Sequence, residues 1–280
     1  MIIDAIKMCE DRKIKQKEDV ELLTEKLGYK PKFVIINASD NPANARYVEN
    51  KIKQGTEVGL DMEVLKFESD CSNEDILNVI NYCKLKKYPV ILQLPTFEHL
   101  DSEKLIKSID YTIDADGFSK EWIGEVNLGN DKLVAPATPK GVIQLLEYHN
   151  VEFKGKVALV IGASNHVSKP LASMLLNREC TLLVAHKETK DLNSLIQQAD
   201  IVISCVGKLD LVKAEYLKQN VVLIGVGFTY VGRKQILDFD LDEVVNSGKP
   251  LLVSNRINCT GKTTVNALID NVIELYKLNF

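Results

Sequence analysis

The chain has 280 residues, of which 45% are hydrophobic, and a formal net charge of −4. This length can bury a substantial core and lies where single cores begin to divide into two domains. Because acidic and basic residues are mixed along the chain, we expect no long-range field that would gather nucleic acid or an anionic membrane, and a small-molecule partner is favoured.

The cysteines and the N-terminal residues bear on the cellular compartment. The six cysteines are scattered, with no C-x-x-C pair and no Cys/His spacing that suits zinc. We therefore expect reduced thiols and no metal site. The segment that begins at Met1 becomes charged within one turn, and no apolar stretch approaches the roughly 20 residues that span a bilayer. A cytoplasmic protein is thus expected.

The first half of the chain alternates helical and extended patterns. Residues 4–27 have apolar positions near helical spacing, and a Gly-Tyr-Lys-Pro stretch then ends the pattern. Beyond it, we predict strands and helices in alternation, with strands at 33–36, 62–67 and 89–94 and helices at 43–58 and 73–84. This alternation predicts a parallel sheet with helices on its faces.

The second half repeats the alternation with shorter, more apolar strands, at 157–161, 181–185, 201–204, 221–224 and 251–254. This rhythm is typical of a doubly wound nucleotide-binding domain. A turn-rich segment precedes it, and an amphipathic helix is predicted at residues 263–278. We therefore predict an α/β fold of two domains. The first is an N-terminal αβα domain of residues 1–137 with 264–280, to which the C-terminal helix returns, and the second is a Rossmann-like doubly wound parallel sheet of residues 138–263.

Tyr47 and Lys51 are the first candidates for chemistry. They lie four residues apart in a predicted helix, so both side chains project from one face. Such a pair is common on solvated helices, but here a polar turn leads straight into the helix, where parallel sheets usually form their ligand crevice. Gln93 lies at the end of an apolar strand, just before Pro95, and is placed near the same crevice to orient Lys51.

A carboxylate follows the next segment. Asp116 stands in Asp-Ala-Asp-Gly-Phe, where its two oxygens can accept parallel hydrogen bonds from an amino-pyrimidine edge. Asp114, in the same stretch, is interpreted as turn chemistry before Gly117.

These candidates belong to five short blocks that occur in order: Asp40-Asn41-Pro42-Ala43, Tyr47-Val48-x-x-Lys51, Gln93-Leu94-Pro95, Asp116-Gly117-Phe118 and Pro136-x-Thr138-Pro139-Lys140-Gly141. Together they resemble the signature of the bifunctional methylenetetrahydrofolate dehydrogenase/methenyltetrahydrofolate cyclohydrolase family, and the resemblance covers nearly the whole chain. It implies tetrahydrofolate derivatives as substrates, NADP-linked oxidation followed by hydrolysis, and a homodimer.

The resemblance also implies roles for individual residues. Lys51 would be the catalytic acid/base, Gln93 would hold it, and Tyr47 would pack against the pterin and aminobenzoyl system. Asp116 would bind the pterin ring, with Leu94 and Pro95 as further substrate-binding residues.

A strand, a tight turn and a helix start at residues 157–170 form the place where a Rossmann domain binds pyrophosphate. The turn resembles the family's G-R-S-x-x-V-G-x-P, but Ala163 replaces the arginine and Ser168 the second glycine. A side chain at Ser168 is expected to narrow the backbone approach that glycine allows. The cofactor-binding residues predicted from this turn and from two later turns are Gly162, Ala163, Ser164, His186, Lys187, Val206 and Gly207.

The choice between NADP and NAD depends on the turn after the second strand of this half. His186 and Lys187 stand there in place of an acidic residue that would hold a ribose diol. Nothing at that position repels a 2'-phosphate, and Lys187 could partly replace the lost arginine, although both residues could equally be solvated surface charges. NADP is therefore expected ahead of NAD.

Two further departures bear on hydride transfer. Gly225 stands where the family has an aspartate, and residues 256–264 replace the family's P-G-G-V-G-P-x-T, which lines the place where nicotinamide meets folate. Two alternatives to the bifunctional enzyme therefore stay open: a methenyltetrahydrofolate cyclohydrolase without dehydrogenase activity, and a folate-binding homologue without turnover.

Overall fold

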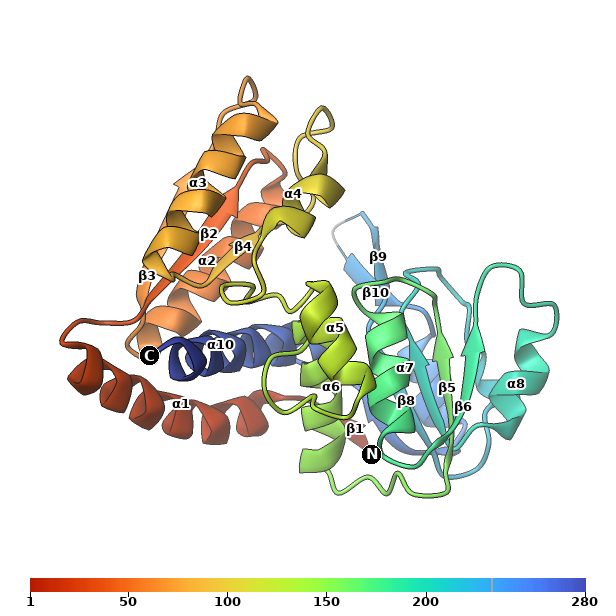
Figure 1. Cartoon of the computed structure of the whole chain (residues 1–280). Coiled ribbons are helices and arrows are strands. Elements are labelled where there is room, and N and C mark those ends of the chain that lie inside the picture. The colour runs from red at the N-terminus through yellow and green to blue at the C-terminus, as the bar shows by residue number, and fades with distance from the viewer. Residues whose placement is uncertain (233) are drawn as a thin grey trace. The chain divides into compact units, whose positions relative to one another are not determined.

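The computed structural model describes residues 1–232 and 234–280 and has the expected α/β fold (Figure 1). Its contacts divide the chain into two compact units. Unit 1 consists of Met1–Cys9, Val126–Gly129 and Thr138–Thr264, and unit 2 of Glu10–Glu125, Asn130–Ala137 and Val265–Phe280. From the sequence we predicted that residues 1–9 and 126–129 belong to the N-terminal domain. Their contacts instead place them in unit 1, together with residues 138–264.

Unit 2 is a parallel sheet between two helical layers. Its strand order is β3 (Asp61–Lys66), β2 (Lys32–Asn37) and β4 (Val90–Leu92). The alternation of side chains along β2 sends Phe33 and Ile35 into one apolar cluster and Val34 and Ile36 into another. The first cluster includes α1 (Ile6–Leu27), α2 (Pro42–Glu57) and α10 (Thr260–Asn279), and the second α3 (Asn73–Lys86) and α4 (Ser102–Ser108).

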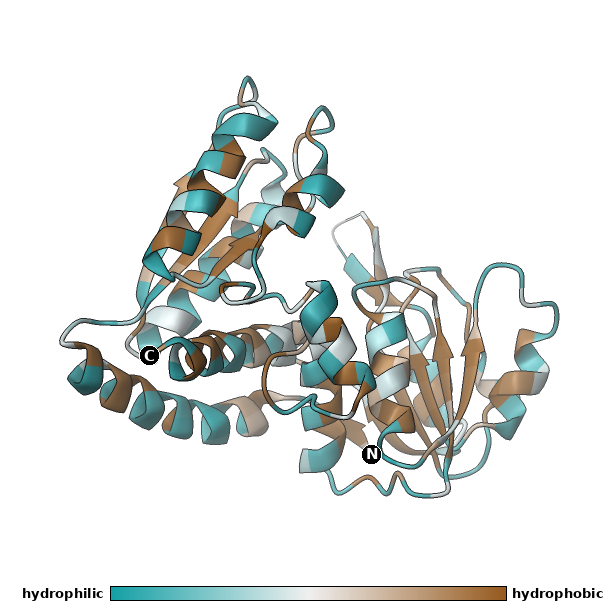
Figure 2. Ribbon diagram, viewed as in Figure 1, coloured by the Kyte–Doolittle hydropathy of each residue, from teal (hydrophilic) through white to brown (hydrophobic). Residues whose placement is uncertain are grey.

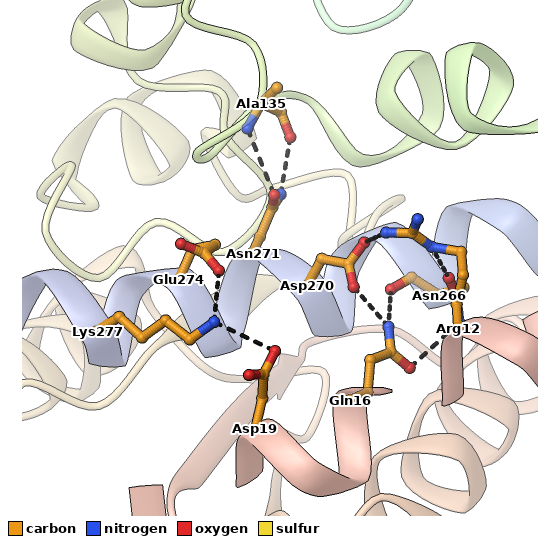
Figure 3. Close-up of polar contacts among 9 residues, drawn as sticks. All are labelled: Arg12, Gln16, Asp19, Ala135, Asn266, Asp270, Asn271, Glu274 and Lys277. Carbon is orange, nitrogen blue, oxygen red and sulfur yellow. Dashed lines mark hydrogen bonds and ion pairs between the residues drawn. The ribbon is translucent and has the colours of Figure 1, made fainter. Parts of the chain in front are cut away.

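Helix α10 returns to the first half of the chain, which confirms the prediction for the C-terminal helix. Figure 3 shows the polar contacts that fasten it to α1. Gln16 donates to the Asp270 carboxylate (2.7 Å) and to the Asn266 carbonyl (2.9 Å), and Arg12 bonds to the same two residues. Apolar residues of α10, among them Leu268 and Val272, belong to the same apolar cluster as Phe33 and Ile35 of β2. The helix is thus part of the unit 2 core.

Unit 1 contains a parallel sheet in the order β1 (Ile2–Ile3), β11 (Pro250–Ser254), β8 (Val221–Gly225), β7 (Ile201–Ser204), β5 (Val157–Ile161) and β6 (Thr181–Ala185). Residues 1–9 belong to this unit because β1 adds to the sheet beside β11, with Ile2 paired to Val253. Figure 2 shows the hydrophobic residues concentrated in these strands, as buried parallel strands require.

Helices cover the sheet of unit 1. Helix α7 (Ser168–Leu176) lies against β5 and β6 (Figure 1). Leu159 and Ile161 of β5 pack in one cluster with residues of α8 (Leu192–Gln198) and α9 (Leu241–Asn246). The remaining elements are α5 (Lys120–Asn127), α6 (Ala137–Tyr148), a 3-10 turn at Ala214–Tyr216, and the antiparallel pair β9 (Phe228–Val231) and β10 (Lys234–Leu237). In the described part of the chain, no helix has the length and apolar character needed to cross a membrane.

Candidate functional site

Lys51 and Gln93 form a direct pair at one end of the unit 2 sheet. Lys51 projects from α2, and Gln93 follows the last residue of β4. The Lys51 Nζ donates to the Gln93 Oε1 at 2.8 Å. The amide nitrogen of Gln93 is itself bonded to the Leu94 carbonyl (2.8 Å), which fixes the amide so that its oxygen faces the lysine. The pair predicted from the sequence is therefore in contact.

Burial sets the protonation of Lys51 and of a neighbouring carboxyl group. The pKa of Lys51 is lowered from its ordinary value because burial disfavours the ammonium, and the nearby Asp116 opposes this shift. Burial also raises the pKa of Asp116 to about 6, with Lys51 opposing. A lysine that loses its proton more readily than usual and a carboxyl group that holds its proton more tightly are suited to proton transfer near neutral pH.

The turn that carries Asp116 is held from two directions. The Asp114 carboxylate accepts from the main-chain nitrogens of Gly117 (3.0 Å) and Ser119 (2.7 Å), as expected of a turn residue. Asn271 of α10, which is fully buried, donates to the carbonyls of Ala115 (2.8 Å) and Ala135 (2.7 Å); Figure 3 shows the contact with Ala135. The position of Asp116 therefore depends on α10 as well as on its own loop.

The other predicted substrate residues lie next to this pair. Tyr47 is half-buried one turn before Lys51 on α2, and Leu94 is half-buried beside Gln93, whereas Pro95 is exposed. Asn44, buried on the same helix, donates to the Pro95 carbonyl at 2.8 Å and ties α2 to the segment after β4. Sequence reasoning missed Asn44, although its helical spacing to Tyr47 and Lys51 was a usable signal.

Unit 1 has a cavity of about 770 Å³ at the carboxyl ends of β5, β6 and β7, within the size range of small-molecule sites. Most of the predicted cofactor residues line it, namely Gly162, Ala163, Ser164, His186, Lys187 and Val206, together with Glu188, Thr189, Cys205 and Lys208. Gly207, the residue that follows Val206 in the same loop, is not among the residues that line the cavity. The predicted residues are thus gathered around one cavity.

The turn after β5 can bring its backbone close to a ligand. Gly162 has a φ of +132°, and a Cβ there would lie 2.6 Å from the Ser168 Oγ. The Ser164 Oγ accepts from the main-chain nitrogens of Val167 and Ser168, both at 3.2 Å, and so organises the entry to α7. Ser168 is buried beneath Gly162 and does not line the cavity. Its side chain therefore does not narrow the approach as the sequence suggested.

The turn after β6 is shaped by its own side chains. The His186 main-chain nitrogen donates to the Thr189 Oγ1 (2.9 Å), and the Glu188 nitrogen donates to the His186 Nδ1 (3.2 Å). Lys187 is exposed at the cavity rim, with its Nζ 3.9 Å from the Glu188 carboxylate. The rim thus carries basic groups together with one carboxylate, and it can accept an anionic ligand group.

The two departures from the family pattern lie next to each other in the structure, joined by a hydrogen bond from Thr260 to Gly225. A Cβ on Gly225 would lie about 3 Å from the side chains of Leu237 and Phe239, so the packing here leaves no room for a larger residue. In the 256–264 segment, helix α10 begins at Thr260, whose Oγ1 donates to the Gly225 carbonyl at 3.2 Å. Residues 256–259 precede this helix, and residues 260–264 form its first turn.

Asp238 is a further residue that sequence reasoning missed. It is fully buried and accepts hydrogen bonds from Ser204 and from the main-chain nitrogens of Val206 and Lys208. No local sequence signal could have found it, because alternation beside the buried Leu237 and Phe239 would place its side chain on the opposite, outward face.

Comparison with known proteins identifies related chains over the full length. The family model described as tetrahydrofolate dehydrogenase/cyclohydrolase, catalytic domain, matches residues 3–116, and the model for the NAD(P)-binding domain of the same family matches residues 136–280. The bifunctional protein FolD of Lactobacillus acidophilus is 35% identical, over 93% of this chain and 92% of the relative. That of Moorella thermoacetica is 34% identical, over 98% and 97%.

Solved structures give the same result. The crystal structure of the bifunctional enzyme FolD, methylenetetrahydrofolate dehydrogenase/cyclohydrolase, from Campylobacter jejuni superposes with a TM-score of 0.94 at 31% identity. The match covers 100% of this chain and 99% of that one. The likeness therefore includes both units, each matched along its length.

Proposed function

Because this chain belongs to the tetrahydrofolate dehydrogenase/cyclohydrolase family, we propose that it catalyses two successive reactions. It oxidises 5,10-methylenetetrahydrofolate to 5,10-methenyltetrahydrofolate with NADP, and it hydrolyses the methenyl product to 10-formyltetrahydrofolate. The full-length match to bifunctional relatives favours this function over a cyclohydrolase without dehydrogenase activity and over a binding protein without turnover.

The single observation that carries the hydrolytic half is the Lys51–Gln93 pair beside Asp116. The methenyl substrate is a cationic amidinium, and water attacks its bridging carbon. Lys51 accepts a proton from that water and returns one to the ring nitrogen whose bond to the bridging carbon breaks. The formyl group stays on the other nitrogen, and one proton is released to solvent overall.

The surrounding residues position the substrate in this proposal. Gln93 holds the Lys51 Nζ in place through its fixed amide oxygen. The Asp116 carboxylate accepts hydrogen bonds from the amino-pyrimidine edge of the pterin, and Tyr47 packs along the ring system with Leu94 and Pro95 nearby. A cationic substrate beside Lys51 also disfavours the ammonium further and keeps the amine available as a base.

The cavity of unit 1 fits a dinucleotide cofactor. The Gly162 turn offers close backbone approach for a pyrophosphate, and the basic rim at His186 and Lys187 suits a 2'-phosphate, which favours NADP over NAD. When bound, NADP supplies the hydride acceptor for the oxidation. Val206 contributes an apolar side chain to the wall of the cavity, and Ala163 and Ser164 complete the turn.

Two assays on the purified protein test the proposal. Methylenetetrahydrofolate and NADP should yield NADPH, followed by its absorbance, and methenyltetrahydrofolate should lose its own absorbance faster than the spontaneous rate. Hydrolysis without NADPH formation would instead favour the cyclohydrolase alternative. Tight folate binding with neither activity would favour the binding homologue.

We also propose that the protein acts in the cytoplasm as a homodimer. None of the described cysteines forms a disulfide, and most are buried, which suits a reducing compartment. The family resemblance implies the dimer, and the exposed side chains of Tyr230 (51%) and Val231 (50%) on β9 offer apolar surface for it. Sedimentation analysis of the purified chain would distinguish a dimer from a monomer.

A further inference from the structure

Asp238 is a buried carboxylate whose hydrogen bonds all come from one short segment. Its side chain accepts from the Ser204 hydroxyl at the end of β7, from the Val206 nitrogen (3.1 Å) and from the Lys208 nitrogen (2.7 Å). Its main-chain carbonyl accepts from the nitrogens of Leu211 (2.8 Å) and Val212 (2.9 Å). A fully buried carboxylate requires hydrogen bonds that compensate for its loss of solvation. Here the donors belong to the loop that follows β7, so the same bonds hold that loop in place.

The same loop forms one wall of the unit 1 cavity. Cys205, Val206 and Lys208 line it, whereas Asp238 lies behind it. The backbone is packed tightly against Asp238 and β9. A Cβ on Gly227 would lie 2.4 Å from the Gly207 nitrogen and 2.6 Å from the Asp238 Oδ2. The main chain of this loop is therefore packed so closely against Gly227 and Asp238 that it has little room for another conformation.

This arrangement determines what the wall can offer a ligand. The nitrogens of Val206 and Lys208 point toward Asp238 and are therefore not available as donors to a ligand in the cavity. The Val206 side chain is 48% exposed and faces the cavity instead. The loop thus presents an apolar side chain, which suits a ring of the cofactor, while the Gly162 turn offers the approach suited to phosphate.

We propose that Asp238 is a positioning residue of the cofactor site: it holds the Val206–Lys208 loop so that Val206 contacts a ring of NADP. The inference rests on the proposed dehydrogenase function. Asp238 acts through the loop and does not touch the cofactor itself.

Replacement of Asp238 by asparagine tests this role with little change in volume. The amide keeps one acceptor oxygen but turns an NH₂ group toward donors that previously met a carboxylate oxygen, so the loop must shift. We expect the Kd for NADPH, measured by fluorescence titration, to rise about tenfold, as expected for a hydrogen bond to a charged group. The KM for NADP should rise with it, while kcat at saturating NADP stays within about twofold.

Asp240→Asn is the matched control. Asp240 lies two residues further on and accepts from the nitrogens of Asp242 (2.9 Å) and Glu243 (3.0 Å) at the start of α9, without a bond to the loop. The Asp240→Asn variant removes the same charge from the same region, so its Kd for NADPH should match that of the wild type. Cyclohydrolase activity should be normal in both variants, because Lys51, Gln93 and Asp116 belong to unit 2.

Ser204→Ala provides a second route, since it removes one donor to Asp238 and leaves the carboxylate in place. A smaller rise in the NADPH Kd is expected. If Asp238→Asn does not fold, the Kd of the Ser204→Ala variant tests the positioning role of Asp238. A Kd unchanged from Asp240→Asn in each variant that folds would overturn the role of Asp238. Wild-type protein that binds neither NADPH nor NADH would instead contradict the proposed dehydrogenase, and the inference would fall with it.

Discussion

Lys51 is subject to two opposing influences, burial that lowers its pKa and the Asp116 carboxylate that raises it. As the proposed base of the hydrolysis, it is the residue whose loss should matter most. We expect Lys51→Met to reduce the cyclohydrolase rate by about 10²–10⁴-fold, the usual contribution of a positioned acid/base group. Loss of methenyltetrahydrofolate absorbance measures the rate. Lys53→Met, on the exposed side of the same helix, should retain normal activity, and equal rates in the two variants would contradict the assignment.

Asp116 should affect the pH dependence of the same reaction. Because its charge raises the pKa of Lys51, Asp116→Asn should let that pKa fall further. A lower pKa leaves more neutral amine at a given pH, so the rise of kcat with pH should move to lower pH. The KM for the folate should increase at the same time, because a hydrogen-bond partner is lost. A kcat profile that stays in place or moves to higher pH would exclude this coupling.

At the scale of single residues, the sequence predicted those positions that follow from local spacing. Tyr47 and Lys51 share a helix face because they are four residues apart, and Gln93 could be placed because a strand ends beside it. Asn271 and Asp238 could not be found in this way. Asn271 acts on Ala115 from 156 residues away and Asp238 on Ser204 from 34 residues away, so their roles arise only once the chain has folded.

Among the elements, α10 contributes to the site as well as to the core. Asn271→Leu should leave the carbonyls of Ala115 and Ala135 without their buried donor. We expect the free energy of unfolding to fall by about 1–3 kcal/mol and the KM for methenyltetrahydrofolate to rise as the Asp116 turn loosens. Denaturant unfolding and steady-state kinetics measure the two effects.

Lys277→Met on the same helix serves as the comparison for Asn271→Leu. Its ion pairs with Asp19 (3.2 Å) and Glu274 (3.0 Å) are partly exposed, so its loss should cost less than about 1 kcal/mol and leave KM unchanged. A destabilised Asn271→Leu protein with a normal KM would limit Asn271 to a structural role.

Elements with a clear period were predicted from the sequence, and short or irregular ones were not. The main strands and helices of both halves lie within a few residues of their predicted positions. Strand β1, Ile2–Ile3, is too short to show a period and exists only because β11 offers an edge. The β9–β10 pair was missed for a similar reason. Strand β4 ends at Leu92 instead of Leu94, and the main-chain nitrogen of Gln93 still donates to the Ile36 carbonyl of β2 (2.8 Å) while its side chain faces Lys51.

In the whole molecule, the two proposed sites belong to separate compact units. Lys51, Gln93 and Asp116 are in unit 2, and the residues that line the cavity are in unit 1. A ligand that binds only the folded state adds stability by mass action, about 2.7 kcal/mol at a hundredfold excess over its Kd. Each ligand should therefore slow amide hydrogen exchange first in the unit that binds it.

This expectation can be measured by hydrogen exchange with mass spectrometry. NADP should protect peptides that contain the Gly162–Ser164 turn and the Val206–Lys208 loop, because the ligand limits local opening of the cavity wall. A folate analogue that cannot be hydrolysed should protect peptides around Lys51 and the Asp114–Ser119 turn. Lys51→Met should leave the NADP pattern unchanged, since it alters only unit 2. Protection by NADP confined to the Lys51 peptides would reverse the assignment of cofactor and substrate to the two units.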